Sequence, residues 1–253
     1  MIKILLNGCN GRMGQAVAAA VENIEDMRIV AGVDVFIEKK NSFPVFADPM
    51  EFRGQCDVVI DFSSAASTHQ LLIFCKSKKL PLVLATTGHS EEQLEEIRLA
   101  SEETAIFKTA NMSLGINLIT ELAKQAAKLL GSTYDIEIIE RHHNQKLDAP
   151  SGTALQIADE IKKVLPFEAE YAYDRHSVRR KREKKEIGMH CIRGGTIVGD
   201  HDILFAGTDE TIQISHSALS RGVFVNGAVK AASFLCGREP GLYSMSDMLA
   251  EIL

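Results

Sequence analysis

The chain opens with Ile2-Lys3-Ile4-Leu5-Leu6-Asn7-Gly8-Cys9-Asn10-Gly11-Arg12-Met13-Gly14, and this stretch decides the fold that we expect for its first part. A short apolar run over residues 2–7 leads into a G-x-x-G-x-x-G turn, and an alanine-rich helical segment follows. This order is typical of dinucleotide binding, because the glycines allow a tight turn, a close approach of the backbone to a pyrophosphate and close helix–strand packing. Exposed N–H groups at the helix start also attract an anion. A glycine-rich turn that binds nothing is the alternative.

An acidic residue, Asp34, ends the second apolar run 20 residues after Gly14, where a carboxylate hydrogen-bonds the ribose hydroxyls of adenosine. An acid here favours NADH, because it repels the 2′-phosphate of NADPH unless a cation compensates. Val35 and Phe36 supply no cation. NADPH stays open, because the lysines at positions 39 and 40 could fold back over a phosphate; a solvated loop is the other interpretation of that pair.

Short apolar runs alternate with amphipathic stretches over the first hundred residues, the pattern that βαβ crossovers and a parallel sheet impose on a sequence. Ser90 followed by Gln93 is a capping-box signature and predicts a helix start. The predicted strands cover residues 2–7, 28–33, 58–62, 82–86 and 105–109.

The character of the sequence changes after a long amphipathic helix predicted over residues 113–130. Three predicted strands follow one another with turn residues between them, which indicates a mixed or antiparallel sheet and hence a second, α+β domain. The predicted strands here cover residues 134–141, 187–193, 197–205 and 211–216, and the predicted helices cover residues 153–165 and 223–235.

Composition places the chain among ordinary globular proteins, with 253 residues, 45% hydrophobic and 25% charged. The 28 basic and 34 acidic residues give a net charge of −6, which argues weakly against nucleic acid as the main partner and leaves room for a local basic patch. Five scattered cysteines favour reduced thiols and a cytoplasmic protein. We expect no metal site, and no apolar run has the length of a membrane span.

The stretch Glu140-Arg141-His142-His143-Asn144-Gln145-Lys146-Leu147-Asp148-Ala149-Pro150-Ser151-Gly152-Thr153-Ala154-Leu155 carries the strongest chemical signal. Two histidines and a lysine leave a predicted strand, and a serine, glycine and threonine then open a helix whose first N–H groups can bind a carboxylate. Histidine donates a proton near neutral pH and lysine offers a fixed charge, so the group suits acid-assisted reduction of an anionic substrate. Packing or capping is the alternative role of the histidines, and metal binding is less favoured because neighbours in a strand point to opposite sides.

Taken together, these motifs make the chain similar to the dihydrodipicolinate reductase family, also called 4-hydroxy-tetrahydrodipicolinate reductase, over essentially its whole length. The E-x-H-H-x-x-K-x-D-A-P-S-G-T-A run is close to the signature of that family. Supporting matches are the Gly8–Gly14 turn, Ala85-Thr86-Thr87-Gly88, Ala110-Asn111-Met112-Ser113, the segment from Arg193 to His201, and the segment from His216 through Ser220-Arg221 to Asn226-Gly227-Ala228.

The resemblance implies an NAD(P)H-dependent oxidoreductase that reduces 4-hydroxy-tetrahydrodipicolinate to tetrahydrodipicolinate in diaminopimelate and lysine biosynthesis. By this resemblance His142 is the proton donor and Lys146 binds substrate and supports the developing charge. The residues implied to contact the substrate carboxylates are His143, Ser151, Gly152 and Thr153. Those implied to bind the cofactor are Gly8, Asn10, Gly11, Arg12, Met13, Gly14, Asp34, Thr86, Thr87, Gly88, Ala110, Asn111 and Met112.

The resemblance also implies an α/β fold in two parts. A Rossmann-type parallel-sheet domain is expected over residues 1–113 and 222–253, and an α+β domain with a mixed sheet, for substrate binding and oligomerisation, over residues 114–221. The expected assembly is a homotetramer, with a small cyclic dicarboxylate as substrate and no nucleic acid or membrane as partner.

Two places depart from the family pattern. Val35 and Phe36 stand where many members carry an arginine, and residues 179–185 hold six basic residues in seven. We interpret the basic run as a solvated loop over the substrate cleft whose positive field draws in a dianion, with a nucleic-acid patch as the alternative. Two functions compete with this one. The chain could be another two-domain nicotinamide dehydrogenase, or a redox-state sensor that binds NAD(P)H without turnover.

Overall fold

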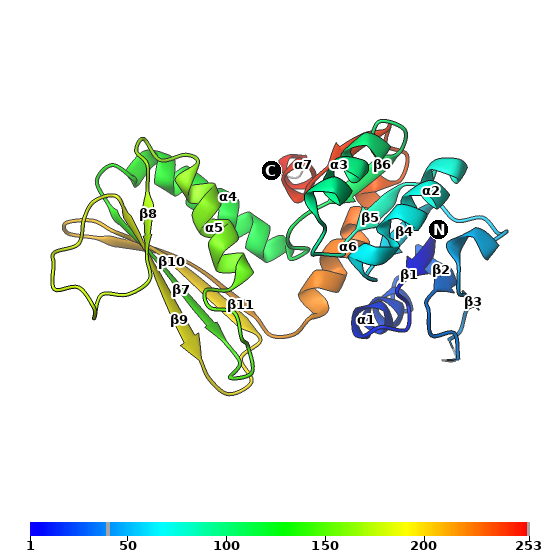
Figure 1. The fold of residues 1–253 in the computed structure, drawn as a ribbon, viewed down its shortest axis with the longest axis horizontal. Helices are drawn as coiled ribbons and strands as arrows, with labels where there is room; N and C mark the ends of the chain where they lie inside the picture. The colour runs from blue at the N-terminus through cyan, green and yellow to red at the C-terminus, as the bar shows by residue number, and fades with distance from the viewer. Residues whose placement is uncertain (39–40, 252–253) are drawn as a thin grey trace. The chain divides into compact units, whose positions relative to one another are not determined.

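The computed structural model describes residues 1–38 and 41–251 and divides the chain into two compact units. The first unit consists of Met1–Leu114 and Gly222–Leu253, and the second consists of Gly115–Arg221. The chain therefore leaves the first unit near residue 114 and returns to it near residue 222, as the ribbon colours show (Figure 1).

Within the described residues, the first unit is built on a seven-stranded sheet whose neighbouring strands all pair in parallel. The strand order is β12 (Gly241–Tyr243), β6 (Ala105–Lys108), β5 (Leu82–Leu84), β4 (Val58–Asp61), β1 (Ile2–Asn7), β2 (Met27–Val33) and β3 (Val45–Phe46). This topology confirms the predicted Rossmann-type parallel sheet.

Alternate residues of the central strand enter two separate cores, one on each face of the sheet. Ile4 and Leu6 of β1 pack in one cluster with α1 and α6, whereas Leu5 packs in the other with α2 and α3. A strand buried on both faces needs an apolar run, and that is what residues 4–6 provide. The helices are α1 (Arg12–Val21), α2 (Thr68–Lys78), α3 (Glu91–Ala100), α6 (Gly222–Leu235) and α7 (Met245–Ala250), with short 3₁₀ turns η1 (Pro49–Glu51) and η2 (Ala65–Ser67).

The second unit combines a five-stranded mixed sheet with helices along one of its faces (Figure 1). Antiparallel pairs join β11, β10 and β7, and parallel pairs join β7, β9 and β8, which confirms the predicted mixed sheet. The sheet order is β11 (Thr211–Ala218), β10 (Gly199–Ala206), β7 (Asp135–His142), β9 (Glu186–Arg193) and β8 (Glu170–Ala172), and the helices are α4 (Leu114–Leu130) and α5 (Gly152–Lys162).

Every second residue of β7 faces these helices and is buried. Ile136 and Ile138 join the apolar core with residues of α4 and α5. Because side chains alternate along a strand, the same face continues with Glu140 and His142, which are buried as well. The register of β7 therefore brings a carboxylate and an imidazole onto the face that the helices cover.

Four short elements, β3, β8, β12 and α7, were not predicted. None of these strands exceeds three residues, so each lacks the length over which a period-two pattern can be recognised. The strand β12 extends the parallel sheet by pairing with β6, residue Gly241 lying opposite Ala105.

The capping box predicted at Ser90 and Gln93 is present, with both of its hydrogen bonds.

The basic run is an exposed loop whose charges are largely paired with acids. Arg182 binds Asp135 and Glu137, Arg180 binds Glu183 and Glu186, and further pairs join Lys184 to Asp135 and Lys185 to Glu170. Each of these carboxylates cancels part of the charge, so the positive field is weaker than the sequence of this loop alone indicates.

The glycine turn is far more crowded at Gly14 than at Gly11. A Cβ built on Gly14 would lie 2.1 Å from the carbonyl oxygen of Gly8, whereas one on Gly11 would meet that oxygen at 3.3 Å. We predict that Gly14→Ala lowers the free energy of unfolding by about 1–3 kcal/mol through overpacking, while Gly11→Ala stays close to the wild type. Urea unfolding measures both, and equal losses in the two variants would contradict this account of the turn.

Candidate functional site

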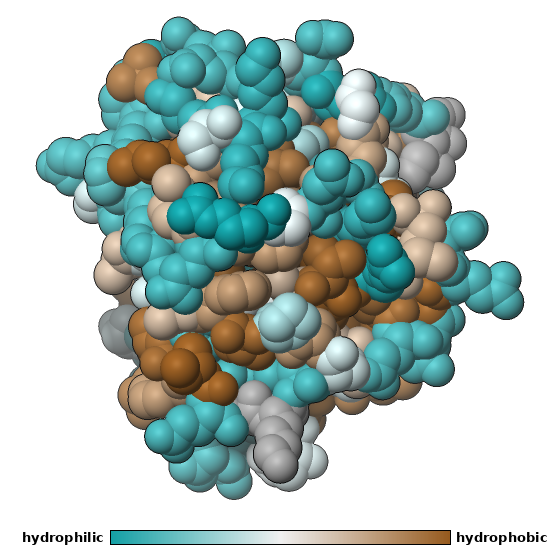
Figure 2. Space-filling view, turned by 90° about the vertical axis from the view of Figure 1, so that its right-hand side faces the viewer, coloured by the Kyte–Doolittle hydropathy of each residue, from teal (hydrophilic) through white to brown (hydrophobic). Residues whose placement is uncertain are grey.

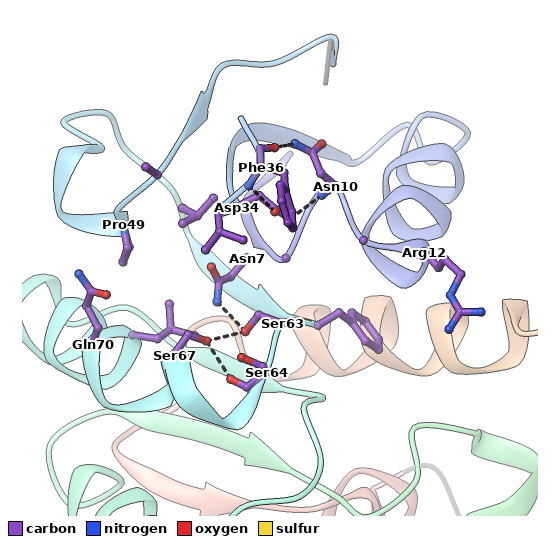
Figure 3. Close-up of a pocket in the computed structure, with 17 residues that line it drawn as sticks. Asn7, Asn10, Arg12, Asp34, Phe36, Pro49, Ser63, Ser64, Ser67 and Gln70 are labelled. Carbon is purple, nitrogen blue, oxygen red and sulfur yellow. Dashed lines mark hydrogen bonds between the residues drawn. The ribbon is translucent and has the colours of Figure 1, made fainter. Parts of the chain in front are cut away.

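The first candidate site is a cavity of about 550 Å³ at the carboxyl ends of the parallel strands (Figure 3). Residues that follow β1, β2 and β4 line it, and in an open parallel sheet this edge is where ligands bind. Five of the residues predicted to bind the cofactor are in the lining: Gly8, Asn10, Gly11, Arg12 and Asp34.

Asp34 lies at the end of β2, where two backbone N–H groups hold its carboxylate. The N–H of Asn10 donates to Oδ2 at 2.8 Å, and the N–H of Phe36 donates to Oδ1 at 3.0 Å. The side-chain amide of Asn10 in turn donates to the carbonyl of Phe36. These bonds tie the glycine turn to the segment after β2 and fix the carboxylate on the cavity wall. Arg12 extends from the start of α1, away from Asp34 (Figure 3).

A second wall of the cavity consists of hydroxyl and amide side chains that sequence reasoning missed. Ser63, Ser64 and Ser67 face the Asp34 side from below, with Gln70 beside them (Figure 3). The hydroxyls of Ser63 and Ser67 lie 2.7 Å apart. In the sequence these serines can be recognised only by their position, because they follow a buried strand at the edge of the sheet where ligands bind.

Asp61, the last residue of β4, is fully buried beneath this wall and joins three strand ends. Its carboxylate accepts from the amide of Asn7 at 2.7 Å, from the hydroxyl of Thr86 at 2.6 Å, and from the backbone N–H of Ser63 at 3.1 Å. Burial raises the pKa of Asp61, and these hydrogen bonds oppose the rise. Thr86, a predicted cofactor residue, is positioned in this way.

The other predicted cofactor residues lie outside the lining that the described residues form. Met13 and Gly14 pack below the turn, and Thr87 and Gly88 belong to the loop after β5, with Gly88 at a φ of 81°. The remaining predicted residues are Ala110, Asn111 and Met112, and the carbonyl of Met112 lies where a Cβ on Gly227 would be, so this loop packs tightly on α6. The lysines at 39 and 40 lie outside the described residues.

These residues fit a dinucleotide. The open backbone at Gly11, the helix start at Arg12 and the carboxylate of Asp34 line one cavity, as pyrophosphate and ribose binding requires. Val35 and Phe36, 82% and 75% exposed at the same end, offer apolar surface for a ring system. Figure 2 shows the side of the molecule that is on the right in Figure 1, where apolar surface lies among hydrophilic side chains.

The second candidate site lies in the second unit, where β7 ends at His142. Its Nδ1 lies 2.7 Å from Oε2 of Glu140, and the guanidinium of Arg193 donates to both oxygens of Glu140, each at 2.7 Å. The backbone N–H of Ser151 donates to Oε1 at 3.1 Å. Burial acts to raise the pKa of Glu140, but the hydrogen bonds from Arg193 and His142 outweigh it and lower the pKa to about 2.

Ser151 is the N-cap residue of α5 and also contacts a third histidine. Its hydroxyl accepts from the N–H of Ala154 at 3.1 Å and lies 3.1 Å from Nε2 of His201. The ring of His201 packs edge-to-face on that of His142, with centroids 5.3 Å apart. Burial lowers the pKa of His201 to about 4. Neither Glu140, Arg193 nor His201 was predicted as a site residue.

Lys146 lies in the loop after β7, where its Nζ binds Oδ2 of Asp148 at 2.8 Å. The hydrogen bond with Lys146 lowers the pKa of Asp148. The N–H of Lys146 donates to the carbonyl of His143 at 3.1 Å, and His143 is half-buried. Among the predicted site residues, His142 and Ser151 are brought together because both contact Glu140. Gly152 is exposed at the start of α5.

No helix within residues 1–38 and 41–251 is long and apolar enough to cross a membrane. In the same part of the chain, no three His, Cys, Asp or Glu residues are grouped so as to hold a metal ion.

Comparison with known proteins gives matches along the whole chain. Residues 2–112 match the family model described as dihydrodipicolinate reductase, N-terminus, and residues 115–249 match the model for the C-terminus of the same family. The 4-hydroxy-tetrahydrodipicolinate reductase of Caldanaerobacter subterraneus subsp. tengcongensis is 51% identical over 253 residues, covering 98% of each chain. The enzyme of that name from Clostridium tetani is 51% identical over 249 residues, covering 98% of this chain and 97% of the relative.

Among solved structures, the dipicolinate-bound dihydrodipicolinate reductase from Paenisporosarcina sp. TG-14 has the same fold. The TM-score is 0.83 at 26% sequence identity, with 96% of this chain and 97% of that chain covered. Both units described above therefore have a counterpart in one solved protein.

Proposed function

The chain belongs to the dihydrodipicolinate reductase family, and from this premise we propose which of its residues carry out the reaction. It is an oxidoreductase of lysine biosynthesis that reduces 4-hydroxy-tetrahydrodipicolinate, a dipicolinate-type substrate, with NAD(P)H. The first unit binds the dinucleotide and the second binds the substrate. One observation supports this division best. The glycine turn suited to a pyrophosphate lies in the first unit, whereas the imidazole of His142, the ammonium group of Lys146 and the start of α5 lie in the second.

His142 is the proton donor of the proposed mechanism. The 4-hydroxyl group leaves the substrate as water. The nicotinamide, when bound, supplies a hydride to the unsaturated ring, and the imidazolium form of His142 protonates the ring carbon that gains electron density. Because Nδ1 of His142 is bonded to Glu140, Nε2 is the atom left to serve the substrate. A Cβ on Gly199 would lie 3.0 Å from that Nε2, so glycine at this position keeps the atom clear of a side chain.

Lys146 and the start of α5 hold the substrate carboxylates. The ammonium group already binds one carboxylate, that of Asp148, which is 58% exposed and can give way to a ligand. Gly152 is exposed at the start of α5, where its backbone N–H hydrogen-bonds the carboxylate of Asp148, the group that a substrate carboxylate would replace. Ser151 and Thr153 flank it. His143, next to the proton donor, completes the proposed carboxylate contacts.

We predict that His142→Gln lowers kcat by about 10²–10⁴-fold and leaves the Kd for NADH near the wild-type value, because a general acid acts only in the chemical step. His176→Gln, at an exposed histidine of the same unit, is the matched control and keeps normal turnover. Steady-state kinetics followed at the absorbance of reduced nicotinamide measures both. Near-normal turnover of the His142 variant would remove this residue from the mechanism.

NADH is the preferred cofactor in this proposal. Asp34 presents its carboxylate to the cavity, and neither Val35 nor Phe36 offers a cation to a 2′-phosphate. We expect NADH to bind about tenfold or more tightly than NADPH, a difference of about 1.4 kcal/mol or more. Asp34→Ser should narrow this ratio, whereas Asp26→Asn, at an exposed acid of the same unit, should not. Parallel fluorescence titrations with NADH and NADPH measure the two Kd values. An unchanged ratio of these Kd values in the Asp34 variant contradicts the role of Asp34 in cofactor preference.

The second unit also supports a proposed homotetramer in the cytoplasm. The face of its sheet opposite α4 and α5 carries Ile139 and Leu204, half-buried, with Ile192 47% exposed beside them. Apolar side chains on a sheet face that no helix of the described unit covers favour pairing with other copies.

Light scattering after size exclusion should give a mass about four times that of one chain. Leu204→Lys, at the centre of the proposed interface, should dissociate the tetramer because it places a charged side chain where the interface needs an apolar contact. Leu129→Lys, at an exposed leucine on α4, should not. A monomeric wild type, or a tetrameric Leu204 variant, overturns the proposed interface.

A further inference from the structure

Two glutamates of β7 stand in matched surroundings on opposite faces of the strand. Glu137 binds Nε2 of His190 at 2.7 Å and the guanidinium groups of Arg175 and Arg182 at 2.8 and 2.9 Å. Glu140 binds Nδ1 of His142 at 2.7 Å and one guanidinium. Each carboxylate therefore joins a histidine to arginine, and only the second faces the proposed site.

Glu140 is 1% exposed, and both of its oxygens are fully engaged. Oε2 accepts from His142 and from Nη1 of Arg193, and Oε1 accepts from Nη2 of Arg193 and from the N–H of Ser151. An ionised carboxylate only accepts hydrogen bonds, so Nδ1 of His142 must carry a proton to make its bond. The proton that His142 gives to the substrate is therefore the one on Nε2 of the imidazolium. The neutral imidazole that remains keeps its proton on Nδ1.

The same carboxylate is connected to Lys146 through its second partner. Nη2 of Arg193 also donates to the backbone carbonyl of Asp148 at 2.6 Å, and the side chain of Asp148 binds Nζ of Lys146 at 2.8 Å. The contacts therefore run without a gap from the imidazole through Glu140 and Arg193 to the ammonium group. A planar guanidinium with fixed donors suits this role, because it holds two partners in one geometry.

We propose that Glu140 is a positioning residue of the reductase, which sets the tautomer and ring orientation of His142 and, through Arg193, the place of the Lys146 loop. This inference rests on the proposed function, because it requires His142 to be the proton donor. It predicts a loss in the chemical step that a merely structural ion pair would not produce. Without this carboxylate the imidazolium of His142 is less stabilised and its ring is not held with Nε2 toward the substrate, while the cofactor still binds.

The test compares Glu140→Gln with Glu137→Gln. Both substitutions keep the shape of the side chain and remove one charge from a His–Glu–Arg cluster on β7. In Glu140→Gln we expect kcat to fall about 10–100-fold with an unchanged Kd for NADH. We also expect ¹⁵N spectra of the neutral His142 ring to show a mixture of tautomers in place of one protonated at Nδ1. Glu137→Gln should lose stability while its kcat and its His142 spectrum match the wild type.

Each outcome decides a different point. A Glu140→Gln enzyme with kcat within about twofold of wild type and an unchanged His142 spectrum overturns the positioning role, even if His142→Gln is inactive. An active His142→Gln enzyme instead overturns the proposed function itself. Should Glu140→Gln fail to fold, Arg193→Lys carries the test, because it keeps the charge but loses the two-point contact; unchanged turnover there likewise overturns the proposal.

Discussion

A buried, ionised carboxylate must have hydrogen-bond donors around it, because its transfer from water costs far more than one contact returns. Glu140 meets this constraint with donors from three separate segments: His142 of β7, Arg193 of β9 and the N–H of Ser151 before α5. The need to satisfy one side chain thus joins two strands and a helix start. The arrangement of the proposed proton donor and carboxylate contacts depends on it.

The first unit uses the same physical principle at its ligand-binding edge. Asp61 is buried at the end of β4 and collects donors from Asn7 after β1 and Thr86 after β5. Its bonds hold three loops at the carboxyl edge of the parallel sheet, while Asp34 ties the glycine turn to the segment after β2. In each unit a carboxylate that is not itself proposed to react shapes the place where a ligand is proposed to bind.

Local patterns in the sequence predicted the fold, whereas the contacts between distant segments could not be predicted from it. The strand over residues 2–7 and the capping box at Ser90 depend on neighbours in the chain, and both are present. The partnership of Glu140 with Arg193 depends on the parallel pairing of β7 and β9 and on a separation of 53 residues. No periodicity predicts such a register. The sequence places Glu140 in a family signature, but its contacts with Arg193 and Ser151, like the position of the serines after β4, become visible only in three dimensions.

The central claim is that Glu140 holds His142 with Nε2 presented to the substrate. A crystal structure of the enzyme with NADH and dipicolinate tests it most directly. The account predicts that Nδ1 of His142 stays bonded to Glu140 while Nε2 lies at contact distance, about 3–3.5 Å, from the dipicolinate ring. A complex in which the ligand lies away from Nε2, or in which His142 has left Glu140 to bind it, would contradict the account.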